Sequence, residues 1–166
     1  LDGTMNFKDG LGMLPHGPML GIFDSRDPKF EDGIASGFLD FPSENLFYAQ
    51  RGSGSWLRRK TGQGYSEDMK IQTSGRKKLS DKGKLRVLLD RYMLGKMLDS
   101  TIFDRLAADY GENVFPGYLR SAAAELALLA AGSLDVWVKA DNSLHPNKFF
   151  TGEEIGPAYL LVTESG

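Results

Sequence analysis

The chain of 166 residues contains no cysteine and only two histidines, His16 and His145. Without cysteine it can form neither a disulfide framework nor a thiolate metal site. The two histidines are isolated and lack the spacing of metal ligands, so we expect both to be ordinary loop residues rather than ligands or general bases. No apolar run approaches the about 20 residues that a membrane-spanning helix needs, and no signal-peptide pattern is visible. These absences favour a cytoplasmic protein.

An excess of charge of one sign is also missing, since 20 Lys and Arg residues and 22 Asp and Glu residues give a net charge of −2. Such a balance favours neither nucleic acid nor a membrane surface as a partner. Residues 51–83 are locally basic, but acidic residues interrupt them and only Trp56 and Tyr65 offer rings for base stacking. We therefore predict a solvated hairpin and loop there rather than a nucleic-acid interface. A phosphate-attracting rim and a polyanion-binding module are the alternatives.

The composition is that of an ordinary globular domain, with 41% hydrophobic and 25% charged residues, and the length allows one sizeable core. Glycine and proline separate segments with strand and helix patterns. We predict a strand near 19–23, a hairpin over 34–50 that turns at 42–45, a strand over 84–89, a helix from Ser100 or Thr101 to about Tyr110, a strand over 118–120, a helix from Ser121 to Gly132, a strand over 134–139 and a helix over 153–164 despite Pro157. This alternation predicts an α/β fold of the layered α+β kind.

The first seven residues, Leu-Asp-Gly-Thr-Met-Asn-Phe, carry the strongest chemical pattern. Asp2 is a hard oxygen ligand of the kind that Mg²⁺ prefers, and Gly3 lets the backbone turn tightly and approach a ligand. Thr4 adds a hydroxyl and a backbone N–H. An acid, a glycine and a hydroxyl residue at the start of a helix can form a phosphate and metal cradle. The alternative is an Asx-type turn in which Asp2 is an ordinary cap.

Three further segments occur together with this motif. Residues 37–54 contain Gly-Phe-Leu-Asp-Phe-Pro, then Leu-Phe-Tyr-Ala, then Gly-Ser-Gly; residues 119–135 contain Arg-Ser-Ala-Ala-Ala-Glu-Leu-Ala and later Ala-Gly-Ser-Leu-Asp; residues 159–166 end in Leu-Leu-Val-Thr-Glu-Ser-Gly. With residues 1–7, these segments resemble, in order, four motifs of the inositol monophosphatase family. That family is part of the Mg²⁺-dependent sugar phosphatases, which include the fructose-1,6-bisphosphatases.

The resemblance implies a layered αβαβα sugar-phosphatase fold that is incomplete at the N-terminus and the C-terminus of this chain. We expect about 80–90 residues of the family's fold to precede residue 1, a length within the size of a subdomain. Residues 1–83 would be the remainder of an N-terminal α+β subdomain with its hairpin, and residues 84–166 a C-terminal α/β subdomain. The resemblance also implies a homodimer.

By resemblance, the chain is part of a phosphatase that hydrolyses a sugar or inositol phosphate monoester with Mg²⁺ as cofactor. Asp2 and the backbone carbonyl of Leu1 would be metal ligands, and Gly3 and Thr4 would donate backbone N–H groups to the phosphate. The Thr4 hydroxyl would orient the attacking water together with a glutamate that precedes this chain in the family. Because part of this ligand set is absent, we expect the isolated chain to be inactive.

The resemblance places further site residues at positions where the chain departs from the family. Glu154 aligns with an aspartate that binds the distal metal ion; it is either that ligand or an acid that complements the first turn of a helix. The family's Gly-Ser/Thr-Ala segment, which lines the sugar, corresponds to Arg120, Ser121 and Ala122. Arg120 replaces a glycine of the family; it crowds a sugar ring, clamps a second phosphate or forms a surface salt bridge. Lys139 stands where several members have a glutamate.

Two cations at these positions favour an anionic substrate, such as a bisphosphate or another acidic sugar phosphate. Asp135, by contrast, is predicted to be a cap or strand-end residue rather than a ligand. The competing class of function is a non-catalytic protein of the same fold that binds a sugar phosphate or regulates a partner.

Overall fold

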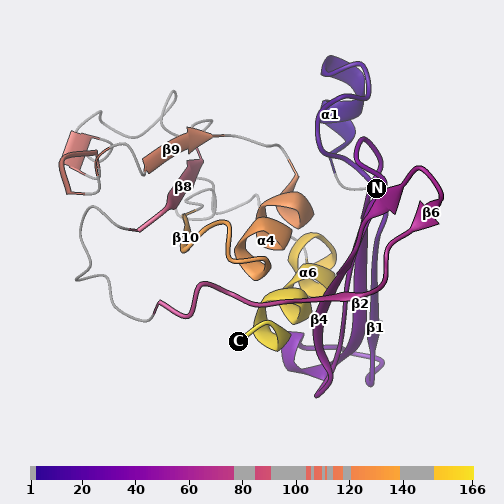
Figure 1. The fold of residues 1–166 in the computed structure, drawn as a ribbon. Coiled ribbons are helices and arrows are strands. Elements are labelled where there is room, and N and C mark those ends of the chain that lie inside the picture. The colour runs from indigo at the N-terminus through magenta and orange to yellow at the C-terminus, as the bar shows by residue number, and fades with distance from the viewer. Residues whose placement is uncertain are drawn as a thin grey trace.

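A five-stranded and a three-stranded β-sheet lie on either side of a pair of helices in the computed structural model of the chain (Figure 1), and two short strands within residues 60–65 form a third sheet. The structure describes residues 3–76, 85–90, 104–105, 107–109, 111, 114–117, 121–138 and 152–166. Its elements are α1 (Thr4–Asp9), β1 (Met19–Phe23), the 3₁₀-helix η1 (Phe30–Asp32), β2 (Gly33–Asp40), β3 (Asn45–Gln50), β4 (Gly54–Arg58), β5 (Lys60–Thr61), β6 (Gly64–Tyr65), β7 (Met69–Ile71), β8 (Val87–Asp90), β9 (Val114–Gly117), α4 (Ala122–Ala130), β10 (Val136–Val138) and α6 (Gly152–Glu164).

The larger sheet has five antiparallel strands in the order β1-β2-β3-β4-β7. Its centre is the predicted hairpin of β2 and β3, in which Phe38 pairs with Phe47 and Asp40 with Asn45. The turn between them contains Glu44 with a φ of 51°. The predicted strand over 19–23 is β1, and the described part of the basic segment, residues 51–76, contains β4 to β7 with their turns. These predictions of local structure are confirmed.

The smaller sheet has three parallel strands in the order β10-β8-β9. β8 and β10 lie within the predicted strands over 84–89 and 134–139, except that β8 extends to Asp90. β9 occupies Val114–Gly117, before the predicted strand over 118–120, whose residues lie outside those the structure describes. β9 contains Pro116, which disfavours a strand in the sequence; β9 tolerates it at the edge of the described sheet. Residues 104–105 and 107–109 are helical, within the predicted helix.

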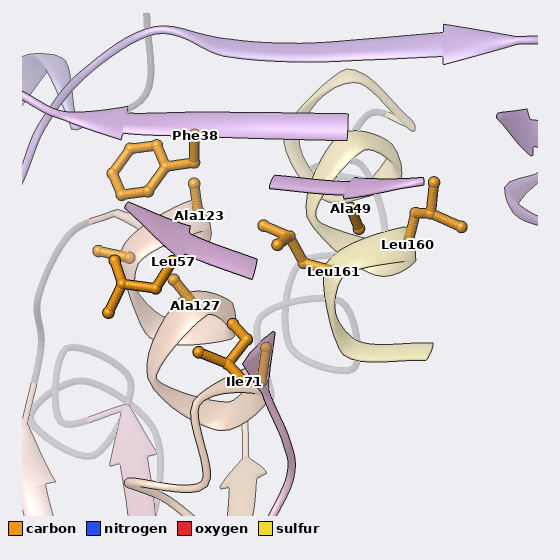
Figure 2. Close-up of a cluster of buried hydrophobic side chains, with 10 residues drawn as sticks. Phe38, Ala49, Leu57, Ile71, Ala123, Ala127, Leu160 and Leu161 are labelled. Carbon is orange, nitrogen blue, oxygen red and sulfur yellow. The ribbon is translucent and has the colours of Figure 1, made fainter. Parts of the chain in front are cut away.

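The main hydrophobic core lies between the larger sheet and helices α4 and α6 (Figure 2). Small residues let the helices approach closely, since Ala123, Ala127 and Ala158 are fully or almost fully buried. The core consists of Phe38, Ala49, Leu57 and Ile71 from the sheet and Ala123, Ala124, Ala127, Ala130, Leu160 and Leu161 from the helices. Removing large apolar side chains from water is the main source of stability in such a layer.

Polar side chains fix both helices at defined points. The Ser121 hydroxyl accepts a hydrogen bond from the Ala124 N–H (3.3 Å) and caps α4, a role that serine commonly has at a helix start. The buried Ser55 hydroxyl of β4 donates to the Leu161 carbonyl of α6 (2.6 Å). At the end of α6, the Glu164 carboxylate accepts hydrogen bonds from the N–H groups of Gly52 (2.9 Å) and Gly54 (3.1 Å). α6 is therefore attached to the turn between β3 and β4, despite Pro157 in its interior.

The opposite face of the larger sheet is not covered by any helix of the described residues, and Leu20 and Ile22 of β1 are exposed on it. The two sheets fall on either side of the predicted boundary at residue 83, but α4 and α6 of the second part pack on the sheet of the first. The division into two subdomains stays a prediction. None of the helices in the described residues has the length and apolar character needed to cross a membrane.

Candidate functional site

The turn at Gly3 is the part of the predicted site that the structure describes best. Gly3 has φ 75° and ψ 31°, in the left-handed region, and directly precedes α1, whose Phe7 N–H donates to the Gly3 carbonyl (3.1 Å). A Cβ atom at this position would lie 2.8 Å from the Pro15 carbonyl oxygen and 3.0 Å from the His16 Cβ. Glycine is therefore required here twice, by its backbone conformation and by the close approach of residues 15–16.

Thr4 is the first residue of α1 and is exposed. This helix has six residues, Thr4 included, so its dipole adds little attraction for an anion. Any phosphate bound at this turn would have to be held by individual N–H donors and by a cation. Leu1 and Asp2, the predicted metal ligands, lie outside the described residues.

A layer of buried side chains holds the turn in place from below. Asn6 is fully buried, and its side-chain N–H donates to the Pro15 carbonyl. His16 is 4% exposed, and its ring lies between Phe7 of α1 and Phe41, which follows β2, with centroid distances of 5.4 Å and 5.6 Å. The sequence correctly predicts a loop position for His16, but it gives no signal for this burial, because the contacts join three separate segments.

Ser121 and Ala122 lie at the start of α4 and are almost fully buried. The hydrogen bond from the Ala124 N–H gives the Ser121 hydroxyl a structural role at the start of α4. Arg120 and Lys139, the two predicted substrate cations, lie outside the described residues. The substrate side of the site therefore stays a prediction.

Glu154 is the third residue of α6, in its first turn. This backbone position suits both alternatives drawn from the sequence, a metal ligand and an acid that complements the helix start. Among the residues that the structure describes, no three acidic or histidine side chains gather in a way that could hold a metal ion. The predicted oxygen donors, namely two carboxylates and a carbonyl, are of the type that suits Mg²⁺.

Asp135 forms a buried ion pair with Arg86. Its side chain is inaccessible to solvent and accepts hydrogen bonds from the backbone N–H of Arg86 (2.7 Å) and from its guanidinium (both 3.1 Å). Arg76 lies 3.7 Å away. Burial alone would raise the pKa of Asp135, but the hydrogen bonds from Arg86 outweigh it and hold the pKa well below its usual range. Asp135 is therefore a structural residue that joins the starts of β8 and β10, as predicted.

Sequence reasoning missed a second buried carboxylate, Glu125. It lies on α4 at 1% exposure, and its Oε2 accepts a hydrogen bond from the Trp137 indole N–H of β10 (2.8 Å). This bond joins α4 to the smaller sheet. The pattern of alanine and leucine around Glu125 predicts a buried helix face, and an acid on such a face is the one available sign of a paired carboxylate.

The basic segment carries several cations that are already paired. Arg58 forms a two-point salt bridge with Asp68 (2.7 Å and 2.9 Å), and Lys60 lies 3.6 Å from Glu44. Hydrogen bonds from Arg58 lower the pKa of Asp68. Lys70 lies over the Trp56 ring, 5.9 Å from its centroid. This arrangement fits the solvated hairpin that the sequence predicts.

No protein-family model and no curated protein matches the chain. Solved structures do match it. Inositol monophosphatase II from Staphylococcus aureus MSSA476 has a TM-score of 0.69 at 18% identity, covering 99% of this chain and 51% of that one. Mycobacterium tuberculosis SuhB gives 0.63 at 18% identity, with 99% and 57% coverage. The Pyrococcus horikoshii protein PH1897, described as having similarities for inositol-1 monophosphatase, gives 0.63 at 22%, with 99% and 51% coverage.

The chain therefore has a mixed α/β fold like that of the inositol monophosphatases, and it spans about half the length of the solved structures it matches. One of the Staphylococcus aureus structures contains inositol monophosphate.

Proposed function

We propose that the complete protein is a Mg²⁺-dependent phosphatase that hydrolyses a sugar or inositol phosphate monoester. The observation that carries this proposal is the Gly3 turn. Gly3 has a left-handed backbone and packs closely against residues 15–16. It stands between an acid and a hydroxyl residue, in a chain whose fold is like that of the inositol monophosphatases.

Asp2, the Leu1 carbonyl and Glu154 are the residues that would hold Mg²⁺. When bound, the ion supplies charge neutralisation at the phosphoryl oxygens and lowers the pKa of a coordinated water. The remaining tasks belong to the chain itself. The N–H groups of Gly3 and Thr4 would donate to phosphoryl oxygens, because fixed donors near the developing charge stabilise the transition state. The Thr4 hydroxyl oxygen would accept a hydrogen bond from the attacking water and direct its lone pair toward phosphorus.

The substrate side consists of Ser121 and Ala122 at the start of α4, with Arg120 before them and Lys139 after β10. Two cations in these places support an anionic sugar phosphate rather than a neutral polyol monophosphate. Arg120 would bind a second phosphate through two N–H groups, and Lys139 would act as a point charge.

The experiment is release of inorganic phosphate by the complete protein, with inositol-1-phosphate and fructose-1,6-bisphosphate as substrates and Mg²⁺ varied. Hydrolysis that depends on Mg²⁺ supports a phosphatase, and a higher kcat/KM for the bisphosphate supports the anionic substrate. Binding of either compound without turnover would instead favour the non-catalytic sugar-phosphate-binding protein.

A cytoplasmic location and a homodimer complete the proposal. The location rests on the absence of cysteine from this chain. The dimer is supported by the exposed apolar side chains of β1, where Leu20 is 65% exposed. Light scattering on the purified complete protein would give the oligomeric state directly.

A further inference from the structure

His16 is a buried residue that the mechanism above does not use. We propose that it is a positioning residue that fixes the Gly3 turn, and with it the residues that bind phosphate. This inference rests on the proposed function of the turn. It assigns His16 a role in substrate affinity, although the residue itself does not touch substrate.

The first step is the contact between the turn and residues 15–16. The three atoms nearest to a Cβ built on Gly3 are the Pro15 carbonyl oxygen, the His16 Cβ and the His16 Cα, at 2.8, 3.0 and 3.1 Å. The Pro15 carbonyl also accepts a hydrogen bond from the buried side chain of Asn6. Both Gly3 and the first turn of α1 therefore pack against the backbone of residues 15–16.

The His16 side chain fixes the backbone of residues 15–16. The His16 Nδ1 lies 2.7 Å from the Leu14 carbonyl oxygen. A carbonyl can only accept, so Nδ1 carries the proton and donates it. This bond spans two residues and closes the loop tightly. The His16 ring is then wedged between Phe7 and Phe41.

Backbone hydrogen bonds connect residues 16–18 to the end of β2 in the larger sheet. The Phe41 N–H donates to the His16 carbonyl (2.9 Å), and the Leu39 N–H donates to the Pro18 carbonyl (3.2 Å). Between them, a Cβ on Gly17 would lie only 1.7 Å from the Leu39 carbonyl oxygen. The end of β2 thus fixes residues 16–18, and His16 transmits that position to Gly3. A displacement of about 1 Å in a group that orients a substrate can lower activity about 100-fold.

The test compares three variants of the complete protein at saturating Mg²⁺, with inorganic phosphate as the calorimetric probe and kcat and KM as second readouts. His16→Ala removes both donor and ring and should weaken phosphate binding about tenfold, which corresponds to about 1.4 kcal/mol. His16→Asn keeps an N–H donor near the position of Nδ1 and should recover most of the affinity. His16→Phe keeps the ring without the donor and should stay weak.

The control is Leu57→Ala, which opens the main core on β4 without touching the loop. It should lower the melting temperature and leave the phosphate affinity of the folded protein unchanged. If His16→Ala does not fold, the phosphate affinities of His16→Asn and His16→Phe are compared instead, and tighter binding by His16→Asn supports the inference. Equal affinity of wild type and of every folded His16 variant overturns this inference and leaves the proposed function standing. A wild type that neither binds nor releases phosphate overturns both.

Discussion

Replacing Gly3 by alanine tests the turn directly, because the chain offers a matched control at Gly52. Both glycines have nearly the same left-handed backbone, with φ of 75° and 74°. A Cβ at Gly3 would press on the backbone of residues 15–16, whereas a Cβ at Gly52 would meet nothing within 4 Å. The pair therefore separates the cost of backbone conformation from the cost of the close contact.

The magnitudes follow from these two terms. An L-residue in the left-handed region costs about 1–2 kcal/mol, and both variants lose that. Overpacking against backbone adds about 1–3 kcal/mol, and Gly3→Ala alone carries this term. We expect Gly52→Ala to lower the free energy of unfolding by about 1–2 kcal/mol and Gly3→Ala by about 2–5 kcal/mol, or to displace the turn instead.

The assay is urea denaturation of both variants, followed by calorimetric titration of the folded proteins with inorganic phosphate at saturating Mg²⁺. Gly3→Ala should lose phosphate affinity and Gly52→Ala should keep it. Equal stability losses together with equal phosphate affinities would refute the close contact at Gly3 and its proposed link to binding.

Two further predictions concern the scaffold. Glu164→Gln should lower the free energy of unfolding by about 1–2 kcal/mol, since the single amide oxygen can accept from the N–H of Gly52 or of Gly54 but not from both. In urea denaturation the control Glu67→Gln, at an exposed position, should change the free energy of unfolding little. An equal loss in the control would argue against a stabilising role of the two Glu164 hydrogen bonds. Because the pKa of Asp135 is lowered in the folded state, its contribution to stability is fully present above the ordinary carboxyl pKa of about 4 and is lost as the pH falls toward the lowered value. Asp135→Asn should flatten stability against pH in that acid range, and an unchanged acid limb would contradict the Arg86 pair.

Local patterns predicted the elements that depend on neighbours in sequence. The hairpin of β2 and β3 follows from strand patterns around a turn at Pro42, and α4 follows from the run of alanine and leucine that starts at Ser121. The need for glycine at position 3 was also expected from its motif. No strand is predicted at β9 (Val114–Gly117). It contains Pro116, which a strand accepts at the edge of a sheet, and β9 lies at the edge of the described three-stranded sheet.

The support of the candidate site depends on contacts that no local pattern contains. His16 is buried because Phe7, Phe41 and the Gly3 turn meet around it, and these segments are separated by loops without periodicity. Glu125 is tolerated in a buried helix face because Trp137, twelve residues later, supplies a donor. Sequence reasoning could place both residues in an element but could not pair them, since pairing is decided by how the layers stack.

The proposed phosphatase depends on the motif at residues 1–4 as part of a working metal site. The most direct measurement is phosphate release from inositol-1-phosphate and fructose-1,6-bisphosphate by the complete protein and its Asp2→Asn variant, over a titration with Mg²⁺. Loss of one carboxylate ligand should abolish Mg²⁺-dependent release while the melting temperature without Mg²⁺ stays close to that of the wild type. Near-normal, Mg²⁺-dependent release by Asp2→Asn would contradict the assignment.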